Sequence, residues 1–205
     1  MGLADLHIHS IHSYDGTSTI PAILKHTAEN THLAVIAITD HDSMAGVNQA
    51  LDLAPAYGLQ VIPGCEISSA QGHVLALFIH KRIPAGLSFL ETLMLIGEQG
   101  GIAIAAHPLA KGTCSLNFDI IRETCDHPFA SKVLVGVEAF NGGLVYTRSN
   151  KTIAALSSQL ALAQVGNSDA HILEGIGQGS SYFPGTTAMD LRFALLNRLT
   201  WVGTY

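Results

Sequence analysis

Apolar residues recur along the chain in short continuous runs, separated by longer stretches whose apolar positions have a helical spacing. Short runs rich in Val, Ile, Leu and Ala are typical of strands that are covered on both faces of a sheet. The predicted strands are residues 3–9, 33–39, 59–63, 74–79, 102–106, 134–140 and 160–165. The predicted helices are residues 21–30, 43–57, 87–99, 118–125, 147–159 and 188–199.

Strand and helix alternate about seven times, which predicts an α/β fold with a parallel sheet. Thr19 and Pro21 suit the start of the first helix, and Gly58 suits the end of the second. We predict that the sheet closes into a (β/α) barrel, although an open doubly wound sheet has the same local pattern. No GxGxxG motif follows a strand, so a dinucleotide fold has no support. Residues 1–205 contain no evident linker and are predicted to form one domain.

Composition sets the broad class of the protein. The chain is 48% hydrophobic and 13% charged, enough for a large buried core. Its formal charge of −6 argues against nucleic acid held in a basic groove. The three cysteines, Cys65, Cys114 and Cys125, have no CxxC spacing, which is typical of a reducing compartment. With no apolar run of membrane-spanning length, we expect a cytoplasmic protein that does not bind membranes.

Histidine is unusually frequent, because 11 His exceed the 10 Lys and Arg together. The clusters of acidic and imidazole side chains fall near the carboxyl ends of predicted strands, which in a parallel barrel share one rim. These residues are Asp5, His7, His9, Asp40, His41, Glu66, His80, His107, Glu138, Asp169 and His171. Imidazole and carboxylate ligands suit Mn²⁺, Zn²⁺ or Fe. They are too many for one tetrahedral ion, so we predict two or three ions with a bridging carboxylate.

The ordered motifs DLHIHS, SYDG, ITDHD, GCEIS, GHVLAL, AAHP and NSDAH carry a family resemblance. The chain resembles the PHP (polymerase and histidinol phosphatase) family of metal-dependent phosphoesterases, nearest the small branch of nucleotide phosphatases and 5′-3′ exoribonucleases. The resemblance implies a distorted (β/α)7 barrel similar to a TIM barrel. It also implies hydrolysis of a phosphate monoester by metal-activated water. The substrate would be small, such as a nucleotide, or a short 5′-phosphorylated oligonucleotide, and no protein partner is expected.

The resemblance also implies three metal-binding sets that share Glu66. The sets are His7, His9, Glu66 and Asp169; then Glu66, His73 and His107; then Asp15, His41 and His171. Mn²⁺ is favoured, with Zn²⁺ or Fe as alternatives. Glu66, Asp169 and His171 are the predicted catalytic residues, of which Asp169 or His171 would accept or relay a proton.

Two ligand assignments have an alternative in the sequence. The position of His80 at the end of the fourth predicted strand favours it as a rim residue, whereas the GHVLAL motif favours His73, which we prefer. Related branches place a histidine where this chain offers Asp15, and His12 lies nearby. The SYDG motif favours Asp15.

Supporting residues are predicted from their place beside the ligands. Asp5 and Asp40 would orient imidazoles. Arg148 is the first candidate for binding phosphate oxygens, and the further candidates are Lys81, Arg82 and Lys111. The stretch GIGQGSSYFPG is predicted to be a flexible loop near His171.

Larger members of the same branch insert a helical lid between the fourth strand and the AHP strand. Here one predicted helix, residues 87–99, fills that link, so the lid is expected to be absent. Two other functions remain open. One is an amidohydrolase-like enzyme acting on C–N or C–O bonds, which typically wants a lysine or glutamate at the fourth strand. The other is a metal-binding module without catalysis that regulates a partner.

Overall fold

The computed structural model of the protein describes residues 1–110, 114–143, 148–157 and 159–204. Its strands are β1 (Gly2–Ile8), β2 (Val35–Ile38), β3 (Gln60–Ser69), β4 (Gly72–Leu77), β5 (Ile102–Ala105), β6 (Leu134–Asn141), β7 (Ala163–Asn167), β8 (Gly179–Phe183) and β9 (Trp201–Thr204). Its α-helices are α1 (Ile20–Asn30), α2 (Val47–Leu53), α3 (Phe89–Glu98), α4 (Phe118–Asp126), α5 (Ala130–Val133), α6 (Arg148–Ser157) and α7 (Ala188–Leu196).

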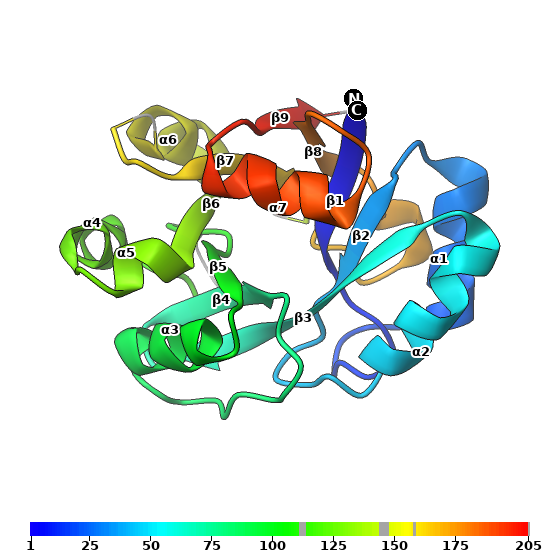
Figure 1. Cartoon of the computed structure of the whole chain (residues 1–205), viewed down its shortest axis with the longest axis horizontal. Coiled ribbons are helices and arrows are strands. Elements are labelled where there is room, and N and C mark those ends of the chain that lie inside the picture. Colours follow the sequence, from blue (N-terminus) through cyan, green and yellow to red (C-terminus); the bar gives the residue numbers. More distant parts are fainter. Residues whose placement is uncertain (111–113, 144–147, 158, 205) are drawn as a thin grey trace.

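The described strands form one sheet in the order β7-β6-β5-β4-β3-β2-β1-β8-β9, which curls into a ring with helices around it (Figure 1). Individual hydrogen bonds join β7, at one end of the sheet, to β8 and β1, near the other end. Gly166 N in β7 donates to Ser181 Oγ in β8 at 3.0 Å, and Leu6 N in β1 donates to Asn167 Oδ1 at 2.9 Å. The sheet is therefore a nearly closed barrel in a single domain, and the predicted fold class is confirmed.

β4 runs antiparallel to both of its neighbours, β3 and β5, so the prediction of an entirely parallel sheet was wrong. Only Ala70 and Gln71 separate β3 from β4. A link of two residues makes a hairpin, whereas a parallel crossover needs a dozen residues or more. As a consequence the beginning of β4, rather than its end, lies at the rim reached by the carboxyl ends of the parallel strands.

The strands β8 and β9 were not predicted. β8 lies inside the stretch expected to be a flexible loop, and it pairs antiparallel with β1 and β9. Its residues Ser180 and Ser181 are fully buried. Buried hydroxyl side chains interrupt the apolar pattern from which strands were predicted, which explains the omission.

Several element boundaries also differ from the prediction. β3 extends to Ser69, so Glu66 lies within the strand rather than after it. The helix predicted over residues 43–57 begins only at Val47 and ends in a 3₁₀ turn, Ala54–Tyr57. The capping predictions are confirmed, because Thr19 accepts a hydrogen bond from Ala22 N and Gly58 is left-handed, with φ 70°.

Helix α7 crosses the ring at the end opposite to the carboxyl ends of the parallel strands (Figure 1). Ala188 N donates to Gln60 Oε1 at the start of β3, and Arg192 Nη2 donates to Gly100 O just before β5. The buried face of α7, which includes Leu191 and Leu195, packs into the barrel core. This helix therefore covers one end of the barrel and leaves the other end free for a site.

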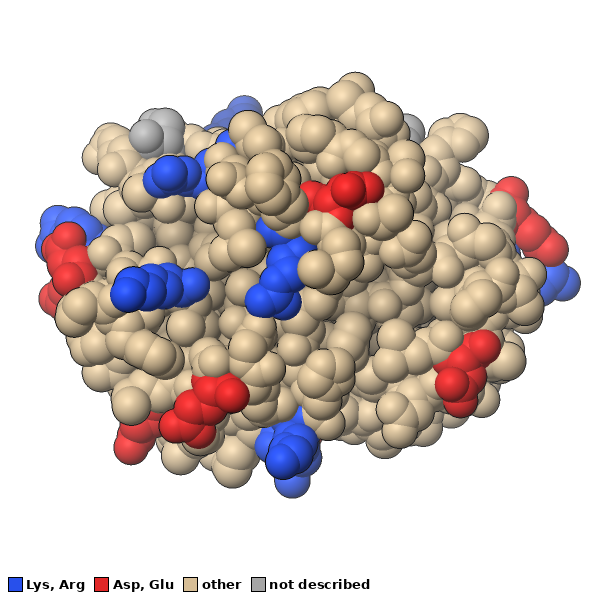
Figure 2. All heavy atoms as spheres, in the orientation of Figure 1, with Lys and Arg blue, Asp and Glu red and all other residues tan. Residues whose placement is uncertain are grey.

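The face that α7 occupies carries positive and negative side chains spread among uncharged ones (Figure 2). No stretch of this face gathers only basic side chains, in keeping with the net charge of −6. Among the described residues, every helix is too short or too polar to cross a membrane.

Candidate metal centre

Glu66 lies at the centre of a buried cluster of imidazoles, with 1% of its side chain exposed. Oε1 of Glu66 is 3.0 Å from both His73 Nδ1 and His107 Nε2. Oε2 faces three further nitrogens: His7 Nε2 at 3.0 Å, His9 Nε2 at 3.4 Å and His41 Nδ1 at 3.3 Å. One carboxylate thus faces two separate groups of imidazoles, as a bridging ligand would.

The first group is formed by β1 and the residues after β7. His7 and His9, which alternate along the chain at the end of β1, both face Asp169 Oδ1, at 3.3 Å and 3.2 Å. Together with Glu66, their ligand atoms lie within 4.8 Å of one another. This is the first predicted ligand set.

The second group lies on the other side of Glu66. His73 reaches it from the start of β4, and His107 reaches it from the residue pair after β5. The ligand atoms of His41, Glu66 and His73 also lie within 4.8 Å of one another, which the sequence had not predicted. His41 therefore lies between the second group and the third.

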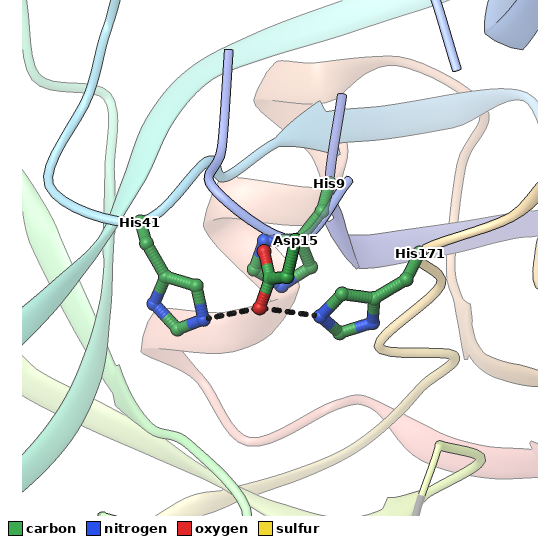
Figure 3. Close-up of side chains that lie close together, drawn as sticks. All are labelled: His9, Asp15, His41 and His171. Carbon is green, nitrogen blue, oxygen red and sulfur yellow. Dashed lines mark hydrogen bonds and ion pairs between the residues drawn. The ribbon is translucent and has the colours of Figure 1, made fainter. Parts of the chain in front are cut away.

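The third group joins loops that are far apart in sequence (Figure 3). Asp15 Oδ2 lies between His41 Nε2 at 3.4 Å and His171 Nε2 at 3.1 Å. His9 also belongs to this group, within the same 4.8 Å limit. The structure thus brings all nine predicted ligands into one continuous cluster.

Charge explains how these groups titrate. Burial on its own lowers the pKa of His7, but the carboxylates of Asp169, Glu66 and Glu138 raise it well above the ordinary value. Burial raises the pKa of Glu66, and His7 with the other neighbouring imidazoles outweighs it and lowers that pKa well below the ordinary value. The pKa of Asp169 is lowered in the same way. The cluster therefore holds ionised carboxylates that favour positive charge beside them.

Several buried polar atoms of the cluster have no hydrogen-bond partner among the described residues. They are His7 Nε2, His41 Nδ1, Glu66 Oε2 and His73 Nδ1. His7 Nε2 and Glu66 Oε2 are close, but their geometry does not make a hydrogen bond. Buried polar atoms left unpaired are rare in folded proteins. Nitrogen and oxygen atoms converging in this way fit divalent metal ions, and the donor set matches that of Mn²⁺, Zn²⁺ or Fe.

Comparison with known proteins decides the family. Residues 5–138 match the family described as PHP domain, and residues 147–199 match the one described as PHP-associated. The chain belongs to the PHP family of metal-dependent phosphoesterases. The resemblance predicted from the motifs is confirmed.

Relatives in sequence include an uncharacterized protein and two named enzymes. An uncharacterized protein of Methanocaldococcus jannaschii, MJ1587, is 34% identical over 147 residues, which cover 67% of this chain and 81% of that protein. The 3′,5′-nucleoside bisphosphate phosphatase of Chromobacterium violaceum is 32% identical over 62% of this chain and 45% of its own length. The 5′-3′ exoribonuclease of Haemophilus influenzae is 34% identical over 49% of this chain and 37% of its own length. The chain thus spans less than half of either named enzyme.

Solved structures share the fold at low sequence identity. A two-domain protein from Bacteroides vulgatus, described as containing a predicted PHP-like metal-dependent phosphoesterase, has a TM-score of 0.76 at 20% identity. The match covers 99% of this chain and 64% of that one. A protein from Chromobacterium violaceum described as an amidohydrolase has a TM-score of 0.71 at 19% identity, covering 98% and 97% of the two chains.

Glu138, which had no predicted role, forms hydrogen bonds with two histidines of the cluster. Glu138 Oε1 accepts a hydrogen bond from His7 Nδ1 at 2.8 Å, and Oε2 accepts one from His107 N at 2.6 Å. Asn141 Nδ2 and Asn167 Nδ2 also donate to it, at 3.1 Å and 2.7 Å. The sequence signal was a lone carboxylate inside the apolar run VGVEAF. Its role is to fix the orientation of His7.

Asp5 and Asp40 do not contact imidazoles, so that prediction was wrong for both. Asp5 accepts hydrogen bonds from the main-chain nitrogens of Ser168 and Gly177, both at 3.0 Å. Asp40 accepts from Ser10 N and Ser10 Oγ. Burial raises the pKa of Asp5 to about 6 despite these bonds. Asp5 also accepts a hydrogen bond from His7 N at 3.3 Å, so the two carboxylates hold the main chain around the predicted ligands rather than their imidazole rings.

The position of His80 separates the two alternatives for the fourth strand. His80 is exposed, and its main-chain nitrogen binds Gln99 Oε1 near the start of β5, away from the cluster. His80 was expected at the rim because the fourth strand was predicted to be parallel, whereas β4 is antiparallel. His73 occupies the rim instead. His12 is exposed and lies outside the cluster, whereas Asp15 lies within it.

The predicted phosphate-binding cations are not found at the cluster in the described residues. Lys81 lies beside Gln99 at the opposite end of the barrel, because it follows the antiparallel β4. Arg82 Nε donates at 2.7 Å to O of Asp42, which is next to His41 in the chain, and Arg82 is not in the described lining of the cavity at the cluster. Lys111 and the side chain of Arg148 lie outside the described part of the chain. The role proposed for Arg148 therefore stays a prediction.

Two members of the cluster have an uncommon backbone conformation. His107 and Asp169 have positive φ angles, 26° and 54°. Non-glycine residues in this region are strained, and such strain is often found at functional sites where the surrounding structure enforces it. Each residue begins the loop after a strand, and the turn directs its side chain back towards Glu66.

The cluster forms the floor of a cavity of about 300 Å³. Its described lining consists of Tyr14, Asp15, His41, Glu66, His73, His107, Cys114, Asp169 and His171. A larger cavity of about 640 Å³ lies between α6 and β9, but its described lining contains neither histidine nor carboxylate. The volume of a cavity therefore does not identify the candidate site in this protein. The titratable side chains that converge in the smaller cavity do identify it.

Proposed function

We propose that this chain hydrolyses phosphate monoesters and that the nine clustered residues hold the divalent metal ions of the reaction. The observation that carries the proposal is the Glu66 carboxylate, whose two oxygens face five imidazoles while Oε2 has no hydrogen-bond partner. His7, His9, Glu66 and Asp169 would hold one ion. Glu66, His73 and His107 would hold a second, and Asp15, His41 and His171 a third.

Bound divalent ions supply electrostatic stabilisation of phosphoryl oxygens and lower the pKa of water. The chain itself positions these ions and the substrate. Asp169 and His171 lie towards the open side of the cluster, with side chains 14% and 36% exposed. We assign to one of them the acceptance or relay of the proton that the attacking water loses.

The number of ions is proposed as two or three, and Mn²⁺ as the native metal. Three groups of ligand atoms converge, and they share His9, His41 or Glu66. Shared ligands support neighbouring ions rather than isolated ones. The absence of a thiol ligand supports the choice of a harder metal over a zinc–thiolate site.

The proposed substrate is a nucleotide or a short 5′-phosphorylated oligonucleotide. Relatives named as a bisphosphate phosphatase and a 5′-3′ exoribonuclease support this class. Residues 78–101, which link β4 to β5, contain the single helix α3. We propose that residues 1–205 are one PHP domain without a helical lid at this link, so that the cavity is accessible to short chains.

Other features support a cytoplasmic site of action. Cys65, Cys114 and Cys125 are free thiols, as expected in a reducing compartment. Cys65 is buried and burial raises its pKa, so it is not a metal ligand in this scheme. The amidohydrolase alternative has less support, since no described lysine lines the cavity and the likeness to that structure extends to the fold alone.

A phosphate-release screen tests the proposal. The purified chain, stripped of metal and reloaded with Mn²⁺, is given sugar phosphates, nucleoside monophosphates and bisphosphates, and short 5′-phosphorylated oligonucleotides. We expect release of inorganic phosphate that stops when a chelator removes the metal and resumes when Mn²⁺ is restored. Absence of release from every ester, together with hydrolysis of an amide or lactone panel, would overturn it in favour of the amidohydrolase alternative.

A further inference from the structure

Tyr14 occupies the mouth of the metal-centre cavity in an unusual way. Its side chain is 84% exposed, yet its ring stacks on the imidazole of His41 with centroids 4.9 Å apart and planes 19° apart. The residues on either side are held in place, because Ser13 Oγ donates to Asp15 Oδ1 and accepts a hydrogen bond from His41 N. One face of the Tyr14 ring is therefore fixed against the cluster and the other face is open.

Folding gains little from an aromatic ring left this exposed. Two other described tyrosines have apolar partners, because Tyr57 packs against the core and Tyr182 stacks on Trp201. An aromatic ring at a site mouth offers a flat surface at low cost in side-chain entropy, and planar ligands stack on such surfaces. The exposed face of Tyr14 is therefore a binding feature rather than part of the core.

Two exposed apolar residues lie on the loops near Tyr14. Ile11 and Ile172 are 50% and 52% exposed, on the two loops beside the cavity. Those loops are joined where Thr17 N and Thr17 Oγ1 both donate to His171 O. Apart from the Tyr14 ring, the described lining of the cavity consists of carboxylate, imidazole and thiol side chains, and Ile11 and Ile172 lie outside it on the adjoining loops. A ligand that matches both the Tyr14 ring and the rest of this lining carries a phosphate at one end and a planar, weakly polar group beside it.

We propose that Tyr14 determines substrate specificity by stacking on the base of a nucleoside 5′-phosphate, either free or at the 5′ end of an oligonucleotide. This inference rests on the proposed phosphoesterase function and narrows its substrate class. Sugar phosphates fill the floor of the cavity but leave the Tyr14 face unused. Nucleotides use both, and stacking of a base on an aromatic side chain contributes enough to change affinity about tenfold or more.

A matched pair of substrates isolates the contribution of the base. Adenosine 5′-phosphate and ribose 5-phosphate carry the same ester and sugar, and they differ in the base. With Mn²⁺-loaded protein we expect Tyr14→Ala to lower kcat/KM for the nucleotide about tenfold and to leave that for ribose 5-phosphate within about twofold. Tyr14→Phe should retain the nucleotide preference. His12→Ala, an exposed change in the same loop, serves as the control and should behave like the unaltered chain.

A binding measurement separates this inference from the proposed function. Phosphonate analogues of the two compounds, which resist hydrolysis, are titrated calorimetrically into the Mn²⁺-loaded chain and into Tyr14→Ala. Tighter binding of the nucleotide analogue that Tyr14→Ala abolishes supports the stacking role even if no ester is turned over. Equal losses for both compounds, or no change for either, would overturn it, whether or not the chain proves to be a phosphatase.

Discussion

At the scale of single residues, the centre is organised by hydrogen bonds that set which imidazole nitrogen carries the proton. His171 Nδ1 lies 2.9 Å from the carbonyl oxygen of Asp169, which can only accept, so Nδ1 bears the hydrogen. His7 Nδ1 faces the Glu138 carboxylate in the same way. In the neutral form of both residues the lone pair of Nε2 faces the cluster. The chain thus prepares its imidazoles as ligands before any metal binds.

Replacing Glu138 by Gln tests this preparation. Every group that Glu138 contacts is a donor: His7 Nδ1, His107 N, Asn141 Nδ2 and Asn167 Nδ2. A glutamine amide places an N–H against two of them in either orientation. We expect a loss of about 1–3 kcal/mol in the free energy of unfolding. We also expect Mn²⁺ affinity to fall by about 10–100-fold.

Chemical denaturation and competitive metal titration measure the two effects of Glu138→Gln. The exposed change Glu29→Gln removes one carboxylate from α1 that is not part of the cluster, and it should alter neither quantity. Unchanged metal affinity in Glu138→Gln would show that Glu138 has no part in orienting His7.

The sequence was informative about ligands and less so about their supports. Ligand residues have distinctive types and spacing, so His7, His9 and Asp169 could be singled out before their geometry was known. The partners of Asp5 and Asp40 are main-chain nitrogens and, for Asp40, also the Ser10 hydroxyl. Main-chain donors leave no mark on a sequence, which is why those two carboxylates were assigned to imidazoles. Tyr14 passed unnoticed because exposure cannot be read from residue type.

At the scale of elements, the direction of β4 decides which histidine joins the centre. An apolar run such as VLALFI predicts a buried strand, but it does not show whether that strand runs parallel or antiparallel to its neighbours. The predicted strands, residues 59–63 and 74–79, left about ten residues between them. β3 in fact extends to Ser69, so only Ala70 and Gln71 precede β4, and so short a link joins antiparallel strands. The predicted strands were therefore largely correct in place, while the rim position predicted for His80 was wrong.

A pair of alanine variants tests this consequence. His73→Ala should lower the number of Mn²⁺ equivalents bound per chain by about one, because it removes a nitrogen 3.0 Å from Glu66 Oε1. His80→Ala, a matched change at the other end of the same strand, should leave metal content unaltered. Metal analysis of the two purified proteins gives the answer. Loss of metal in His80→Ala alone would reverse the assignment.

At the scale of the whole molecule, nine strands rather than seven build the described sheet. The additional pair, β8 and β9, extends the sheet beyond β1 and brings Ser181 to β7. The loop between β7 and β8 is held to β1 by Asp5, and it carries Asp169 and His171. The contacts that close the barrel therefore also position Asp169 and His171. A pattern of neighbouring residues in the sequence does not reveal such long-range contacts.

Stability should depend on pH in a direction set by the cluster. Neighbouring carboxylates raise the pKa of His7 and His107 against the effect of burial. The protonated forms of His7 and His107 contribute fully to the stability of the fold below the ordinary histidine pKa of about 6.5. This contribution is lost as the pH rises through their raised pKa values. The lowered pKa of Glu66 changes the stability of the fold only at acid pH, where this carboxylate becomes protonated. The Tm of the metal-free chain should therefore fall as pH rises above about 6.5.

Metal reverses that trend, because binding requires neutral imidazoles and rising pH supplies them. The increase in Tm on adding Mn²⁺ should grow between about pH 6.5 and pH 8.5. Thermal unfolding in a pH series, with and without Mn²⁺ at matched ionic strength, measures both effects. A metal-induced increase that is largest at the acid end would contradict the proposed ligands.

The central claim is that Glu66 joins the ions of a phosphoester-hydrolysing centre. Phosphate release from a nucleoside 5′-phosphate by the Mn²⁺-loaded chain, compared with Glu66→Gln, tests it most directly. We expect turnover in the unaltered chain and none above background in the variant, with the circular dichroism of the barrel retained. Turnover that survives the substitution in a folded protein, or that is unaffected by a chelator, would contradict it.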